Sequence, residues 1–275
     1  MSKNLHKSTV ESFGEEWTYF DQTALSPDEL MRNFQQYFSI FPWETIDEDA
    51  QGFDMGCGSG RWAQLVAPKV GKLHCIDPSE AIQVAKKNLS KFDNIHFHKA
   101  SVDSEVLEPE SQDFGYSIGV LHHVPDTANA IRSCVKFLKP GSPLLLYIYY
   151  AFENRPWWFK SLWKLTDICR RFICVLPAGI KRVITDIIAI FVYFPLSRIA
   201  LTLEKLGFPV ENFPLYYYRN RRFYTLRTDA LDRFGTPLEY RFTKSEIRKM
   251  LEEAGMNNIK FSEDPPYWCV IGYRY

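Results

Sequence analysis

The segment that most constrains the fold of this chain is a glycine-rich run near residue 56. Residues 52–60 have the sequence GFDMGCGSG, and residues 61–67 continue in a helical pattern. An apolar strand that leads into alternating glycines and then a helix is typical of nucleotide-binding α/β folds. Glycine allows the sharp turn and lets the backbone approach a ligand closely. The run therefore predicts a nucleotide site at the carboxyl end of a first parallel strand.

The spacing of these glycines distinguishes between nucleotides. Dinucleotide-binding folds use G-x-G-x-x-G, whereas Gly56, Gly58 and Gly60 follow G-x-G-x-G with Asp54 in front. A carboxylate at that point repels a pyrophosphate but can hold a cationic amino group. The pattern favours S-adenosylmethionine (SAM) over NAD, and a glycine-rich turn without a ligand is the alternative.

A second acid ends the next apolar strand. Residues 71–77 have the sequence GKLHCID, which places Asp77 where both ribose hydroxyls of a nucleoside are held in such folds. Pro78 follows and favours a first helical turn, so Asp77 can also act as a helix cap. The two roles are compatible. A third strand is predicted at residues 94–98, and residues 113–126 contain a fourth.

Residues 52–149 resemble the class I SAM-dependent methyltransferases. The motifs DMGCGSG, CIDPSE, DFGYSIGVLHHVPD and FLKPGSPLLLYIY occur in the order and at the spacing of that family. The resemblance implies a doubly wound, mainly parallel seven-stranded sheet with an antiparallel last strand and helices on both faces. It also implies a helical insertion after the fifth strand, with SAM as cofactor and S-adenosylhomocysteine as product. Residues 227–243 are similar to methyltransferases of bacterial surface-polysaccharide gene clusters.

The resemblance implies a set of cofactor contacts. Asp54 and the glycines after it would line the methionine end of SAM, and Asp77 would hold the ribose. The family usually has Gly-Asp-Ala after the third strand, but residues 100–103 are ASVD here, so the adenine contact is open among the last three. The expected cofactor contacts are Asp54, Gly56, Cys57, Gly58, Gly60, Asp77, Ser101, Val102, Asp103, Ser117 and Gly119.

Transfer of a methyl group from a sulfonium demands alignment, exclusion of water and, for a hydroxyl acceptor, removal of a proton. His122 and His123 follow the fourth strand and are the candidate bases, because the pKa of histidine lies near neutrality. His122 is the favoured base, His123 is the second choice, and the third possibility is that neither acts. Tyr149, at the end of the fifth strand, is expected to orient the acceptor.

The chain divides into four predicted segments. Residues 1–48 form an N-terminal helical cap, 49–150 the SAM-binding α/β core, 151–240 a helical lid that binds the acceptor, and 241–275 a helix and two strands that complete the sheet. A capping-box sequence from Thr243 to Glu246 opens the last helix.

Arginines and tyrosines cluster late in the lid segment. Arg219, Arg221, Arg222 and Tyr224 are candidate acceptor ligands, because guanidinium groups hold carboxylates or phosphates by paired hydrogen bonds. The three arginines have no acid next to them in the sequence, although pairing inside the insertion is the alternative. The expected acceptor group is a hydroxyl of a small anionic molecule, such as a sugar or a nucleotide sugar. The chain has 33 basic and 33 acidic residues, which argues against nucleic acid as partner.

The longest apolar stretch, residues 187–194, lies between Asp186 and Pro195. It is shorter than the roughly 20 residues that cross a bilayer, so a buried lid helix is expected. Contact with a membrane surface, and with it a lipid-like or quinone-like acceptor, is the alternative. A SAM-binding protein that catalyses no reaction is a further alternative. No secretion signal and no metal-binding cysteine pattern is evident, so the expectation is a cytoplasmic protein without a metal. The acceptor atom and the oligomeric state stay open.

Overall fold

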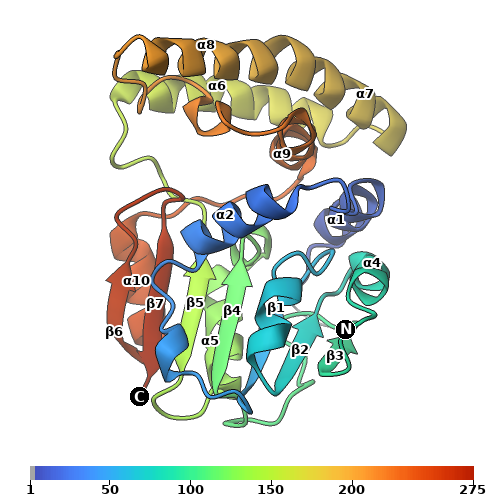
Figure 1. Cartoon of the computed structure of the whole chain (residues 1–275), viewed down its shortest axis with the longest axis vertical. Helices are drawn as coiled ribbons and strands as arrows, with labels where there is room; N and C mark the ends of the chain where they lie inside the picture. Colours follow the sequence, from blue (N-terminus) through green and yellow to red (C-terminus); the bar gives the residue numbers. More distant parts are fainter. Residues whose placement is uncertain (1–3) are drawn as a thin grey trace. The chain divides into compact units, whose positions relative to one another are not determined.

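The computed structural model describes residues 4–275 and contains two compact units. The first extends to Ala151 and resumes from Leu238 to Tyr275, and the second is Phe152–Pro237. The first unit holds a β-sheet with its helices, and the second is helical (Figure 1).

The sheet of the first unit has seven strands in the order β3-β2-β1-β4-β5-β7-β6 (Figure 1). Strand β7 is antiparallel to both of its neighbours, and the other pairs are parallel. The strands are β1 (Gln51–Met55), β2 (Lys72–Ile76), β3 (Ile95–His98), β4 (Phe114–Ile118), β5 (Pro143–Tyr147), β6 (Met256–Phe261) and β7 (Cys269–Arg274). The predicted mainly parallel sheet with an antiparallel last strand is confirmed.

Side chains of the central strands enter two apolar layers, one on each face of the sheet. In β5, Leu145 belongs to one buried cluster, and Leu144 and Leu146 belong to the other. This alternation is the period of two expected for an extended strand. Because both faces are covered, β4 is buried along its whole length.

Helices cover the sheet. They are α1 (Lys7–Tyr19), α2 (Pro27–Tyr37), α3 (Ala63–Val66), α4 (Ala81–Asn88), α5 (Thr127–Phe137) and α10 (Lys244–Glu253). Helices α2, α5 and α10 begin after a side chain that accepts a hydrogen bond from the first turn. The predicted capping box is confirmed, since the Thr243 side chain accepts from the Glu246 N–H while the Glu246 carboxylate accepts from the Thr243 N–H. Gly255, with φ of +88°, follows the end of α10.

The second unit consists of helices around a small apolar cluster. They are α6 (Trp157–Ile173), α7 (Ala178–Ile188), the π-helical turn η4 (Ala189–Tyr193), α8 (Phe194–Lys205), the short 3-10 helix η5 (Tyr216–Tyr218) and α9 (Phe223–Gly235). Helix α9 contacts both α6 and α7. Its Leu226, Ala230 and Phe234 pack with Ala189 and Tyr193 of the π turn.

Residues 187–194 belong to a longer helix, and the expectation that they are buried is wrong, because Ile187 and Phe191 are 50% and 72% exposed. Helix α7, the π turn and α8 form one helix, Ala178–Lys205, of 28 residues and mean hydropathy 1.8 in an 18-residue window that is 28% buried. By length and composition alone, this helix could span a membrane. Pro195 does not end it. Proline lacks an N–H and crowds the preceding turn, and the wider π turn just before Pro195 relieves that crowding.

Candidate functional site

The glycine turn after β1 is tightly enclosed by its neighbours. Gly56 has φ of +81°, and a Cβ there would lie 2.5 Å from both Val120 methyl groups. The Gly56 N–H donates to the Ile76 carbonyl over 2.7 Å, which holds the turn against β2. At Gly58, with φ of +53°, a Cβ would lie 3.2 Å from Trp17 Nε1. Only glycine meets both the left-handed backbone and the close approach at this turn.

Asp77 connects the glycine turn to the end of β2. Its Oδ2 accepts the Gly58 N–H over 2.9 Å, and its Oδ1 accepts both the N–H and the hydroxyl of Ser79 over 2.8 and 2.6 Å. Burial raises the pKa of the Asp77 carboxyl, and the hydrogen bonds from Ser79 and Gly58 oppose that rise. Asp77 thus organises the turn before α4, and its contact with a ribose stays a prediction.

Asp54 is the acid in front of the glycines, and it is 1% exposed. Burial raises the pKa of its carboxyl to about 8, Asp77 adds to the rise, and the Tyr116 hydroxyl and Arg61 oppose it. Among the described residues, nothing hydrogen-bonds to its Oδ2 atom. A buried carboxylate oxygen without a partner fits the ammonium group of SAM, which would satisfy that oxygen and favour the ionised carboxyl.

Asp54 is expected to make the stability of the protein without ligand depend on pH. The folded state keeps the Asp54 proton up to about pH 8, whereas the ordinary value is 3.8. Unfolding therefore releases a proton in that window. The contribution of the protonated Asp54 to stability is fully present below the lower pKa and is lost as the pH rises through the upper pKa. We expect the free energy of unfolding to fall by a few kcal/mol across the window.

Urea unfolding at a series of pH values measures this dependence. Asp54→Asn keeps the shape of the side chain but cannot ionise, so the curve for this variant is expected to be flatter. An unchanged pH slope in the variant would assign the titration to another group.

The first described residues and helix α1 contact the glycine turn and the loops that follow β3 and β4. The Asn4 backbone N–H donates to Asp103 Oδ2 over 3.2 Å, and the Asn4 amide exchanges two 2.8 Å hydrogen bonds with the backbone of Asp126. Asn4 therefore ties together the loops that follow β3 and β4. Helix α1 then brings Trp17 against Gly58, and the Arg61 guanidinium lies 5.6 Å from the Trp17 ring. No local motif in the sequence indicates the role of Asn4.

The predicted adenine segment forms a small network after β3. The Ser101 hydroxyl donates to Asp103 Oδ1 over 2.7 Å and lies 3.0 Å from the Ser104 hydroxyl. Val102 between them is buried. Both Asp103 oxygens thus have protein partners, Ser101 and Asn4. The structure brings the three candidates together, and the choice among them stays a prediction.

The remaining predicted cofactor residues lie on or beside the central strands. The Ser117 hydroxyl donates to the Met55 carbonyl over 2.7 Å and joins β4 to β1. Gly119, with φ of +79°, donates its N–H to the Tyr147 carbonyl. Cys57 is buried, and burial raises the pKa of its thiol. In these positions Ser117 and Cys57 would meet a ligand through backbone groups.

Hydrogen bonds distinguish the two candidate bases. The Tyr149 N–H donates to His122 Nδ1 over 3.4 Å, so neutral His122 carries its proton on Nε2 and its basic nitrogen already has a partner. His123 Nδ1 lies 2.7 Å from the Leu238 carbonyl, which can only accept, so Nε2 is the basic nitrogen of His123. Burial, with His123 and Arg241, lowers the pKa of His122 well below its usual value. These tautomers favour His123 over His122 as base.

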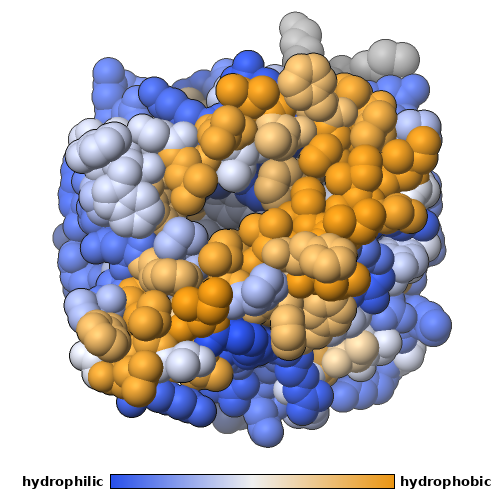
Figure 2. Space-filling view, turned by 90° about the horizontal axis from the view of Figure 1, so that it is seen from above, coloured by the Kyte–Doolittle hydropathy of each residue, from blue (hydrophilic) through white to orange (hydrophobic). Residues whose placement is uncertain are grey.

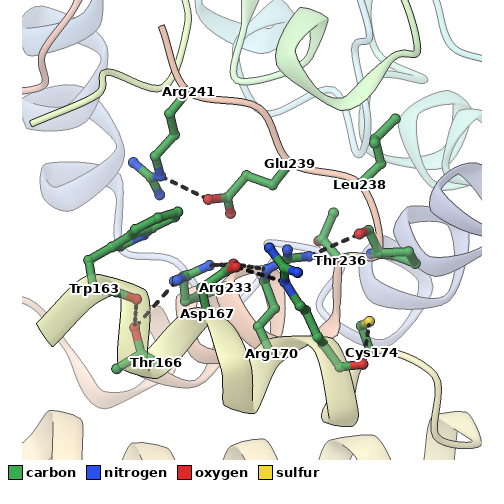
Figure 3. A network of polar contacts seen from close by, with 12 residues as sticks. Trp163, Thr166, Asp167, Arg170, Cys174, Arg233, Thr236, Leu238, Glu239 and Arg241 are labelled. Carbon is green, nitrogen blue, oxygen red and sulfur yellow. Dashed lines mark hydrogen bonds and ion pairs between the residues drawn. The ribbon is translucent and has the colours of Figure 1, made fainter. Parts of the chain in front are cut away.

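Aromatic rings surround the histidines. The Tyr149 ring lies 3.8 Å from the His122 ring and 5.7 Å from the Tyr147 ring, centroid to centroid. The Arg241 guanidinium lies 4.9 Å from the Tyr149 ring, and its Nε–H donates to Glu239 over 2.9 Å (Figure 3). Strand β5 ends at Tyr147, so Tyr149 lies beyond the strand and not at its end, where it was expected. Arg241 has no motif that marks it as part of this cluster.

The arginine cluster of the second unit has internal partners. Arg219 donates two 2.8 Å hydrogen bonds to the Glu204 carboxylate, which is the pairing inside the insertion that the sequence left open as the alternative. Arg221 is 7% exposed and donates to the Tyr217 hydroxyl over 3.1 Å. Arg222 is exposed, and Tyr224 is half-buried. Glu204 lies 15 residues before Arg219, on α8, so the pairing requires the tertiary fold.

Comparison with known proteins gives a family match for part of the first unit. Residues 53–146 match the methyltransferase domain family. A ubiquinone biosynthesis O-methyltransferase of Nitrosospira multiformis is 30% identical over 37% of this chain and 42% of its own length. A protein of the same name from Saccharophagus degradans is 32% identical over 50% of this chain and 60% of its own length. The chain therefore spans about half the length of these relatives.

A solved structure shows the same fold. Phosphoethanolamine N-methyltransferase 2 of Haemonchus contortus, in complex with SAM, aligns with a TM-score of 0.51 at 16% identity over 93% of this chain and 43% of that protein. Residues 53–146 thus match the methyltransferase domain family, and the sheet order is that of the class I methyltransferase fold, whose cofactor is SAM. Among residues 4–275, no cluster of three or more histidine, cysteine or acidic side chains could hold a metal ion.

Proposed function

We propose that the protein is a SAM-dependent methyltransferase that methylates a hydroxyl of an apolar, quinone-like or lipid-like small molecule. The observation that carries the methyltransferase assignment is the glycine turn of β1, joined to Asp77 at the end of β2, inside the matched domain. When bound, SAM supplies an activated methyl group. The chain must then orient the acceptor, exclude water and take up one proton.

Two observations support an apolar acceptor. The histidines lie among the rings of Tyr147 and Tyr149, which offer flat apolar surfaces for an aromatic acceptor. The similar relatives carry the name of ubiquinone biosynthesis enzymes. The case for an anionic acceptor is weakened because Glu204 neutralises Arg219 and because Arg221 is buried against Tyr217.

A hydroxyl of a sugar or nucleotide sugar is the second candidate acceptor. Its support is Arg222, which is exposed at the start of α9 next to Tyr224. A guanidinium in that position can hold a phosphate or carboxylate.

Incubation of the purified full chain with methyl-labelled SAM tests the proposal. The acceptor panel contains hydroquinones and catechols with and without isoprenoid tails, nucleotide sugars and sugar acids, with product identified by mass spectrometry. Label on a phenolic hydroxyl is expected. Label on a nucleotide sugar would support the second candidate, SAM binding without any product would favour a non-catalytic SAM-binding protein, and absence of SAM binding would remove the assignment altogether.

The histidine pair allows a matched test of the base. His123→Asn keeps a donor toward the Leu238 carbonyl, and His122→Asn keeps an acceptor for the Tyr149 N–H. Loss of a general base is expected to lower kcat by about 100-fold, and we expect this loss for His123→Asn. His122→Asn is expected to have a smaller effect, and both variants should bind SAM as the parent does. The opposite ranking would return the role to His122, and two small effects would leave the proton to water.

A further inference from the structure

We propose that the outer face of α6 and of the long helix α7–η4–α8 is a docking surface for an anionic lipid bilayer. This apolar docking face is defined by Leu165, Ile168 and Phe172 of α6 and by Val183, Ile187 and Phe191 of the long helix, each at least half exposed. Figure 2 looks onto this side and shows apolar residues gathered across it. The inference does not depend on methyl transfer, because binding to vesicles requires no turnover.

The long helix has an inverted pattern of polarity. Its buried side recurs every fourth residue and includes the polar Lys181, Thr185 and Ser197. The opposite side carries Val183 and Ile187, which are 60% and 50% exposed. A surface helix of a water-soluble domain shows the reverse, with its apolar stripe toward the core. An apolar outer stripe is stable only where something other than water covers it.

Ionic groups inside the second unit are paired with one another. Asp167 accepts the Arg170 Nε–H over 2.7 Å, and Arg233 lies 3.8 Å from the same carboxylate, which links α6 to α9 (Figure 3). Arg227 of α9 donates two hydrogen bonds, of 2.7 and 2.8 Å, to Asp186 of α7. These ion pairs thus lie between the helices of the unit and not on its outer face.

The charges exposed along α6 select an anionic partner. They are Lys160, Lys164 and Arg171, all cations, while the single acid of the helix, Asp167, is 6% exposed. Basic side chains beside an apolar face attract anionic lipid headgroups. Trp157, 78% exposed at the start of α6, is of the residue type that occupies the interface between headgroups and acyl chains. This combination fits a bilayer better than a second protein surface.

The long helix is expected to lie along the bilayer and not to cross it. Its buried side packs against α9, and its Asp186 and Glu204 form ion pairs within the unit. A spanning helix would leave the Asp186 ion pair in hydrocarbon, whereas a helix in the interfacial plane buries one apolar side and keeps the other on the protein.

Co-sedimentation of the full chain with lipid vesicles tests this inference. The vesicles contain phosphatidylcholine alone or with phosphatidylglycerol. We expect binding to the anionic vesicles that weakens with added salt, because part of the attraction is between Lys160 or Lys164 and headgroups. The double variant Ile187→Glu with Phe191→Glu is expected to lose at least about tenfold in vesicle affinity. Met31→Glu, at an exposed position of α2 in the first unit, is the matched control and should bind as the parent does.

Two measurements keep the outcome interpretable. Thermal unfolding and SAM calorimetry of each variant are expected to match the parent, which excludes a folding defect. A parent that stays in the supernatant with both vesicle types would overturn the proposal, and so would a double variant that still binds anionic vesicles like the parent. A dimer in light scattering that the same double variant dissolves, without vesicle binding, would assign the face to a second copy of the chain.

Discussion

Gly56→Ala is expected to weaken SAM binding by 100-fold or more and to destabilise the domain. The residue adopts φ of +81°, and a Cβ would lie 2.5 Å from the Val120 methyl groups. The left-handed backbone alone costs about 1–2 kcal/mol in a residue with a Cβ, and the overlap must move the turn that would contact the cofactor. Calorimetric titration with SAM and S-adenosylhomocysteine measures the loss, with thermal unfolding as the readout of stability.

Gly141→Ala is the matched control for this variant. Gly141 has the same φ of +81°, but nothing lies within 4 Å of its Cβ position, and it stands in the turn before β5. Both variants carry the same backbone strain, so only Gly56→Ala should lose SAM. Equal SAM affinity in the two variants would show that the turn at Gly56 does not shape the cofactor site.

Asp77→Ala is expected to weaken SAM and S-adenosylhomocysteine by about the same factor, on the order of 100-fold. The substitution removes the acceptor of the Gly58 N–H, so it loosens the glycine turn as well as any ribose contact. Because both ligands carry the same ribose, a loss for one ligand only would contradict a role at the nucleoside. Titration calorimetry of both ligands measures the effect.

Asp93→Ala serves as its control, because Asp93 is an exposed acid before β3. This variant should bind both ligands as the parent does. Tight binding of NAD with no binding of SAM by the parent protein would remove the methyltransferase assignment.

Local patterns predicted the first unit well. The G-x-G-x-G turn, the acid after the second strand and the capping box at Thr243 each depend on residues close in sequence, and the sheet order follows from the class of fold that they indicate.

Contacts between distant residues were not predictable in this way. The partner of Arg219 is Glu204 on another helix, and the tautomers of His122 and His123 depend on Tyr149 and on the Leu238 carbonyl. The continuity of the helix through Pro195 depends on a π turn that no proline rule indicates.

The sequence by itself predicted a mainly parallel sheet, as in the class I methyltransferase fold, and a glycine turn suited to SAM. It could do so because the backbone conformation at glycines and the apolar periodicity of strands are local properties. Only the tertiary structure decided which arginines are neutralised, which histidine nitrogen is basic and which side of the long helix faces outward. Those properties depend on which distant groups pack together, and the spacing of residues along the sequence does not reveal such contacts.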